Sequence, residues 1–80
     1  MPHVNLKIAT GRSDTIKHEL ADAFARALVE IAGAEPSQIS VAIEDVAPER
    51  WAHDVYHHEI TPKTDLLYRL PSYSADDLCR

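Results

Sequence analysis

The sequence is poor in cysteine, in glycine and in long apolar runs, and each shortage excludes a class of protein. Its 80 residues contain one cysteine, two glycines and one tryptophan. The single Cys79 cannot form an internal disulfide, which excludes a disulfide-stapled secreted domain, and we treat it as incidental. No apolar run is long enough to cross a bilayer, and Lys7 and Arg12 interrupt the only candidate signal-peptide core. We therefore expect a cytoplasmic protein with no membrane partner.

Positive charge is also scarce. Eight Lys and Arg residues against 13 Asp and Glu residues give a formal net charge of -5, and the basic residues form no cluster. Because nucleic-acid binding needs a basic face, nucleic acid is excluded as the main partner. The sequence has no Gly-rich phosphate loop, no nucleotide fingerprint and no catalytic Ser/His pattern, and we expect no cofactor.

The apolar residues that are present predict two strands and a helix. Apolar and polar residues alternate over residues 3–8 and again over about 38–45, which is typical of half-buried strands. Between them, apolar residues recur at helical spacing over about residues 14–32. Two strands joined by a helix of this length form a βαβ unit with parallel strands and a right-handed crossover.

Shorter elements follow the second strand. We expect a second helix over about 48–57 and another short helical piece over 62–69, each with a proline in its first turn. Regular structure then ends at residues 71–73, and the tail is polar. The fold class is α/β, with one domain over residues 1–80 that consists of a single βαβ unit and short C-terminal helices.

A βαβ unit of this size cannot cover both sheet edges and the helix face. Pairing two chains gives a four-stranded sheet with two long helices on one side, so we expect a homo-oligomer. The segment past residue 60 and the polar strand face of His3, Asn5 and Lys7 favour a dimer over a hexamer.

Pro2 is the first residue with distinctive chemistry. Proline is the only residue whose α-amine is secondary, and at position 2 it is small enough for the usual removal of Met1. The pKa of an ordinary α-amine is about 7.7–8.0, and an apolar pocket or a nearby cation lowers it. A base poised near neutral pH suits proton abstraction beside a carbonyl. By itself, however, Pro2 is better explained as an ordinary second residue, because a single residue is not a motif.

The context of Pro2 makes the chain resemble the 4-oxalocrotonate tautomerase family of the tautomerase superfamily. Pro2 stands directly before a strand, and residues 11–14 (GRSD) with Lys17 resemble the start of that family's helix. The match covers the βαβ unit and continues into Trp51. Residues 48–51 (PERW) and 70–74 (LPSYS) resemble the longer, dimer-forming bacterial branch of the family.

The resemblance implies an isomerase with named roles for three residues. Pro2 would be the general base that moves a proton between carbon and oxygen of an enol and its keto form. Arg12 would bind a substrate carboxylate or polarise its carbonyl, and Trp51 would form an apolar wall that lowers the pKa of the amine. The site would lie between subunits. Alternatively, Arg12 is a solvated turn residue and Trp51 a core or interface aromatic.

Ser40 is a departure from the family pattern. The type enzyme has a second arginine on the second strand, and Ser40 occupies that position here. Because serine supplies no cation, we expect a substrate with one carboxylate, such as an aromatic 2-oxo acid of the phenylpyruvate kind, with Ser40 lining its site. Whether Arg50 or Arg69 supplies a cation from another part of the pocket stays open.

Two other functions stay open. A non-catalytic oligomeric binding module with the same fold is favoured by Ser40, and by Met1 if it is retained. A promiscuous hydratase or dehalogenase would instead activate water at the same site. His53 and His57 have the i, i+4 spacing of a metal pair on the predicted helix, but no HExxH pattern accompanies them, and we predict no metal site. Either histidine could instead border the pocket.

Overall fold

A computed structural model describes residues 1–78 of the chain. The chain divides into two compact units, Met1–Asp45 and the part from Val46 onward, and each is described by itself. The elements, in chain order, are β1 (His3–Ala9), α1 (Asp14–Ala32), a 3-10 turn (Pro36–Gln38), β2 (Ser40–Val46), a 3-10 helix (Pro48–Arg50), a π-helix (Ala52–Ile60), a further 3-10 helix (Thr61–Leu66) and α2 (Ala75–Leu78).

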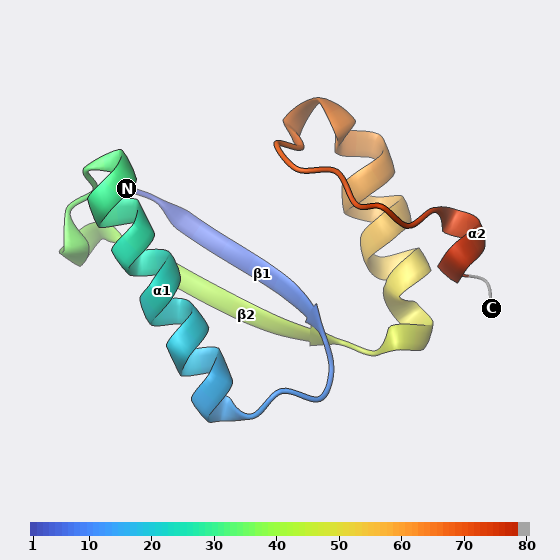
Figure 1. Ribbon diagram of the computed structural model, residues 1–80, viewed down its shortest axis with the longest axis horizontal. Coiled ribbons are helices and arrows are strands. Elements are labelled where there is room, and N and C mark those ends of the chain that lie inside the picture. The colour runs from blue at the N-terminus through green and yellow to red at the C-terminus, as the bar shows by residue number, and fades with distance from the viewer. Residues whose placement is uncertain (79–80) are drawn as a thin grey trace. The chain divides into compact units, whose positions relative to one another are not determined.

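The first unit is the predicted βαβ unit. β1 and β2 are neighbours in a two-stranded sheet, and Figure 1 shows them parallel, with α1 running along one face. The backbone amide of Ser40 donates to the carbonyl of Pro2 at 3.2 Å, which sets the register. At the other end of the pair, Lys7 Nζ lies 3.6 Å from Glu44 Oε2. The predicted fold class is therefore confirmed.

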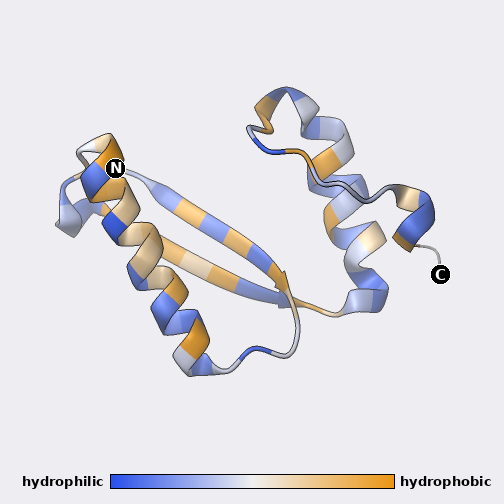
Figure 2. Ribbon diagram, viewed as in Figure 1, coloured by the Kyte–Doolittle hydropathy of each residue, from blue (hydrophilic) through white to orange (hydrophobic). Residues whose placement is uncertain are grey.

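Alternation along the strands explains why α1 covers only one face of the sheet. In β2, Val41 and Ile43 are half-buried while Ala42 and Glu44 are exposed. Figure 2 shows the corresponding change of hydropathy from residue to residue along both strands. The half-buried residues of β2 occupy alternate positions, so we place them on the face that α1 crosses.

The bounds of α1 follow from its caps. The side chain of Ser13 accepts a hydrogen bond from the amide of Ile16 at 3.3 Å. Gly33 ends the helix with φ 68°, a left-handed conformation that glycine adopts readily. The ammonium of Lys17 lies 2.6 Å from the Asp45 carboxylate and ties the first turns of α1 to the end of β2.

Several predicted bounds need correction. β2 begins at Ser40 and not at 38, because residues Pro36–Gln38 form a 3-10 turn in which the amide of Gln38 bonds to the carbonyl of Glu35 at 2.9 Å. The expected helix over 48–57 is a 3-10 helix followed by a π-helix that continues to Ile60. The piece expected over 62–69 spans Thr61–Leu66.

The prediction that regular structure ends at residues 71–73 is also wrong. A further helical turn, α2, follows, and the Asp77 carboxylate accepts hydrogen bonds from the amide and the hydroxyl of Ser74. The side chain of Asp77 therefore closes the start of this turn, a local signal that the polarity of the tail concealed. Cys79 lies outside the described residues.

Very little of the described chain is buried. Among residues 1–78, Val46 and Val55 are the only buried hydrophobic side chains, each still 6–7% exposed. Large apolar side chains are instead exposed, Ile31 at 86% and Leu70 at 70%. A chain with so small a core gains stability from a partner surface. Within residues 1–78, no helix combines the length and the apolarity that crossing a bilayer requires.

Candidate active site

Pro2 is held at the start of the sheet. It directly precedes β1, is half-buried, and its carbonyl accepts the hydrogen bond from the Ser40 amide. Proline contributes no amide donor to the ladder, so its nitrogen has no part in the pairing of the strands. Met1, in contrast, is fully exposed. Its removal would therefore leave the sheet hydrogen bond of Pro2 in place.

Ser40 contacts both Pro2 and His3 at the start of β1. Besides the backbone bond to Pro2, its hydroxyl lies 2.6 Å from Nδ1 of His3, and both side chains are exposed. The sequence named Ser40 as a site residue but placed His3 only on a polar strand face. His3 and Ser40 are the first residues of β1 and β2, and the register of the two parallel strands brings their side chains together.

Arg12 lies at the opposite end of β1. The strand between Pro2 and Arg12 is seven residues long, which is about 20 Å at the usual rise of a β-strand. Gly11, at φ 129°, turns the chain, and the Arg12 guanidinium donates to the carbonyl of Ala9 at 2.9 Å. The side chain is otherwise exposed. One chain thus does not bring its own Arg12 to its own Pro2.

Trp51 belongs to the second unit, where it contacts the C-terminal segment. Its indole Nε1 donates to the hydroxyl of Tyr73 at 3.0 Å, in a partly buried setting. The ring of Tyr73 also packs against Tyr56, with ring centroids 5.8 Å apart. The sequence predicts a role for Trp51 and includes Tyr73 in the 70–74 resemblance, but it assigns Tyr73 no role of its own.

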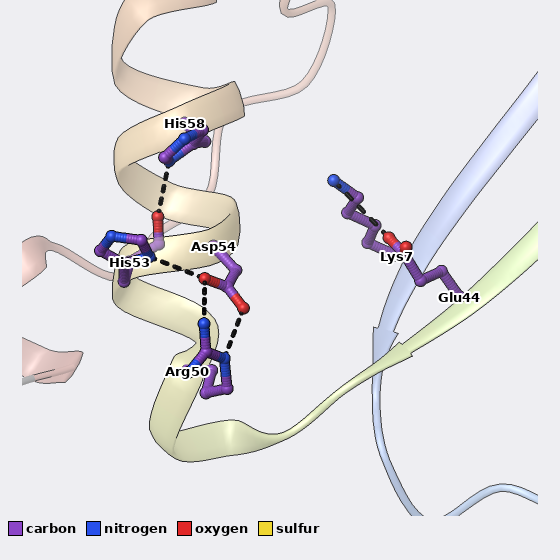
Figure 3. A network of polar contacts seen from close by, with 6 residues as sticks. All are labelled: Lys7, Glu44, Arg50, His53, Asp54 and His58. Carbon is purple, nitrogen blue, oxygen red and sulfur yellow. Dashed lines mark hydrogen bonds and ion pairs between the residues drawn. The ribbon is translucent and has the colours of Figure 1, made fainter.

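Arg50 is engaged in a local network (Figure 3). Its Nε and Nη2 donate to the two carboxylate oxygens of Asp54 at 2.7 and 3.1 Å, and His53 Nδ1 lies 2.7 Å from Asp54 Oδ1. Hydrogen bonds from Arg50 and then His53 lower the pKa of Asp54 to about 2. The hydrogen bond and charge of Asp54 in turn raise the pKa of Arg50. Arg50 is therefore already paired with a carboxylate of its own chain.

The histidine rings of the π-helix pair at a spacing of five residues, and not at the i, i+4 spacing of His53 and His57. His53 is instead the neighbour of His58, with ring centroids 5.4 Å apart and His58 Nδ1 3.0 Å from the His53 carbonyl oxygen. His57 packs edge-on against Tyr56. The wider turn of a π-helix brings residues five apart together. In the part of the chain that the structure describes, no three His, Cys, Asp or Glu side chains are grouped to hold a metal ion.

Comparison with known proteins identifies the family. The family described as "Tautomerase enzyme" matches residues 2–59, a range that includes Pro2, Arg12, Ser40 and Trp51. A protein of Xylella fastidiosa named "Probable tautomerase" is 41% identical over 73 residues, 91% of this chain and 89% of that one. Tautomerase PptA of Cronobacter sakazakii is 36% identical over 74 residues, 91% and 97% of the two chains.

Solved structures agree with this assignment. TomN, a 4-oxalocrotonate tautomerase homologue in the tomaymycin biosynthetic pathway, superposes with a TM-score of 0.61 at 30% identity, covering 62% of this chain and 77% of its own. A heterohexameric 4-oxalocrotonate tautomerase from Chloroflexus aurantiacus gives a TM-score of 0.61 at 27% identity, covering 64% and 82%. The fold and the family that the sequence suggested are confirmed: the chain belongs to the tautomerase family and is a tautomerase-type isomerase.

Proposed function

We propose that the protein is a cofactor-independent keto–enol tautomerase of 2-oxo acids that carry a single carboxylate, with Pro2 as the general base once Met1 is removed. The observation that carries this proposal is the placement of Pro2. The residue is half-buried at the start of β1, and the Ser40 amide holds its carbonyl while its nitrogen takes no part in the sheet.

The reaction moves one proton and needs no other reactant. The neutral secondary amine of Pro2 takes the hydroxyl proton of the enol and becomes an ammonium. It then gives a proton to the carbon next to the newly formed carbonyl, which regenerates the amine and yields the 2-oxo acid. Trp51 serves as an apolar wall that disfavours the ammonium and so lowers the pKa of the amine toward neutral pH.

Arg12 binds the substrate carboxylate, and it comes from another chain. Its guanidinium is permanently charged and matches a carboxylate with two parallel hydrogen bonds. The distance along β1 from Pro2 supports a site shared between two protomers. We propose a cytoplasmic homodimer, in which the exposed apolar side chains of the isolated chain become covered.

The polar groups beside Pro2 support a substrate with a single carboxylate. Ser40 and His3 form a hydrogen-bonded pair there, and neither carries a permanent positive charge. Arg50, the nearest alternative cation in sequence to Trp51, is paired with Asp54. We assign Arg12 to the substrate carboxylate, and the lack of a permanent cation in the Ser40–His3 pair supports a monocarboxylate such as the enol of phenylpyruvate.

The test replaces Pro2 with alanine and follows ketonisation of phenylenolpyruvate. We expect kcat/KM to fall by about 10²- to 10⁴-fold, the usual contribution of a positioned base. Intact-mass measurement on both proteins ensures that Met1 is absent from each. Turnover equal to that of the wild type would show that Pro2 is not the base.

A binding module with this fold is the second candidate, because a serine stands where the family's type enzyme has an arginine. If Met1 remains on the natively produced chain, the nitrogen of Pro2 is an amide and cannot accept a proton. Intact mass of the native protein therefore separates the two functions. If the native chain retains methionine and binds phenylpyruvate without turnover, the binding module is favoured. If the protein instead adds water to an unsaturated or halogenated acid, a hydratase or dehalogenase is favoured.

A further inference from the structure

The hydrogen bond between Trp51 and Tyr73 joins two parts of the chain that are 22 residues apart. The indole N–H donates to the phenol oxygen at 3.0 Å, and both side chains are half-buried. Trp51 stands at the junction of the 3-10 helix Pro48–Arg50 and the π-helix, a point at which the backbone changes its helical period. The indole has no other partner of this kind in the contacts of residues 1–78.

Tyr73 is itself anchored from two sides. Its ring packs against Tyr56 on the π-helix, at a tilt of 45°, next to the buried Val55. On its C-terminal side, the Asp77 carboxylate accepts hydrogen bonds from the amide of Ser74 at 2.8 Å and from its hydroxyl at 3.3 Å. The residue thus belongs to a short irregular segment whose position is set by side chains on both sides.

These contacts give the indole one preferred orientation. A tryptophan held only by packing can change its side-chain rotamer, whereas a hydrogen bond at the indole nitrogen selects the rotamer that keeps it. The family match ends at residue 59, so Tyr73 lies in the part of the chain beyond the matched range. The C-terminal segment therefore adds a contact to Trp51 that the βαβ unit does not contain.

We infer that Tyr73 is a positioning residue, whose hydroxyl orients Trp51 as the wall against which an aromatic substrate packs. This inference rests on the proposed function, because Trp51 borders the substrate only if the proposed site is correct. A correctly oriented indole stacks against the phenyl ring of phenylenolpyruvate and contributes to its binding. An aliphatic enol presents no ring and gains little from the same orientation.

Tyr73→Phe is the sharpest variant, because it removes the hydroxyl and keeps the ring that packs on Tyr56. Trp51 is the only tryptophan of the chain, so intrinsic fluorescence reports on this one side chain. We expect a changed emission maximum and stronger quenching by acrylamide. For phenylenolpyruvate we expect KM to rise about five-fold with kcat nearly unchanged, the size of effect that loss of one hydrogen bond produces. The KM for the enol of 2-oxobutanoate should change less than two-fold by the same reasoning.

Tyr68→Phe is the matched control, since Tyr68 is fully exposed and the same chemical change there should alter neither fluorescence nor KM. A double variant that combines Tyr73→Phe with Trp51→Phe completes a double-mutant cycle. Once the indole N–H is gone, removing the Tyr73 hydroxyl should not raise the KM for phenylenolpyruvate any further. Additive increases in KM would overturn the inference.

The outcomes separate this inference from the proposed function. Unchanged fluorescence in Tyr73→Phe, or a changed emission with the same KM as in Tyr68→Phe, would overturn the role of Tyr73 while leaving Pro2 as the base. If Pro2→Ala keeps full activity but Tyr73→Phe changes both fluorescence and the aromatic KM, the assignment of the base is wrong and the role of Tyr73 stands.

Discussion

Pro2 and Arg12 lie at the two ends of β1, separated by a strand of seven residues or about 20 Å. At one end, the Ser40 amide of β2 donates to the Pro2 carbonyl, and at the other the Arg12 guanidinium donates to the carbonyl of Ala9. A substrate of the size of phenylpyruvate cannot contact both ends of one strand. A site that uses both residues therefore takes them from different chains.

This separation predicts that two inactive variants complement each other. Pro2→Ala and Arg12→Ala should each lose most of their activity as pure oligomers. When they are unfolded together and refolded as an equal mixture, half of the dimers contain one chain of each kind. In a symmetric dimer each such pair has one intact site, so we expect about a quarter of the wild-type rate.

As the control for complementation, each variant is unfolded and refolded alone under the same conditions, which should restore no activity. An unchanged rate in the mixture, with mixed dimers verified by native mass spectrometry, would show that Pro2 and Arg12 do not share a site across chains. Native mass spectrometry of the wild type also tests the preference for a dimer over a hexamer.

Ser40 predicts the charge of the substrate. Ser40→Arg places a guanidinium beside the start of β1, where the serine hydroxyl now bonds to His3. We expect kcat/KM for an enol with a second carboxylate to rise about ten-fold, because a charge-assisted hydrogen bond contributes more than a neutral one. Ser40→Ala is the control and should show no such gain. Equal activity of wild type and Ser40→Arg on the dicarboxylate would contradict the role given to Ser40.

The βαβ unit was predictable because its signals are local and agree with one another. The helix over 14–32 has a period of 3.6, the Ser13 cap at its start and Gly33 at its end, and the structure reproduces these bounds. The strand alternation was equally clear. The start of β2 was misplaced by two residues, since the alternation of residues cannot show that Pro36–Gln38 forms a turn before the strands pair. Each strand also ends one residue later than predicted.

The C-terminal part was less predictable for physical reasons. A π-helix has more residues per turn than an α-helix, so a pattern of 3.6 residues per turn pairs the wrong side chains. It pairs His53 with His57, whereas the neighbour of His53 in the structure is His58. The contact of Trp51 with Tyr73 spans 22 residues and has no periodic signature. The separation of Pro2 from Arg12 was implicit in the strand length, but it became an argument only when the strand ends were known.

The Arg50–Asp54 pair predicts a measurable shift in acid. The pKa of Asp54 is lowered from 3.8 to about 2, first by the hydrogen bond from Arg50. Its contribution to stability is thus fully present above pH 3.8 and is lost as the pH falls through about 2. Because the pair is exposed to solvent, this contribution is small. In Arg50→Met, NMR titration of the Asp54 carboxyl carbon should give a pKa nearer 3.8.

Arg69→Met is the matched control for that titration, since it removes the same charge from an exposed position outside the network. The pKa of Asp54 should then stay about 2. A shift of equal size in both variants would mean that overall charge, and not the hydrogen bonds drawn in Figure 3, lowers the pKa of Asp54.

Gly33 gives a prediction for stability that is independent of the site. Its φ of 68° lets the amides of Gly33 and Ala34 reach the carbonyls of Val29 and Leu28 at 3.1 Å each. A methyl group at this position would meet no atom within 4 Å, so Gly33→Ala tests backbone strain without a clash. We expect a loss of about 1 kcal/mol in the free energy of unfolding. Urea denaturation at one fixed chain concentration measures it, because oligomers unfold at midpoints that depend on concentration. Gly33→Asn, which tolerates the left-handed conformation better, should lose less; equal stability of Gly33→Ala and the wild type would show that α1 does not end in this conformation.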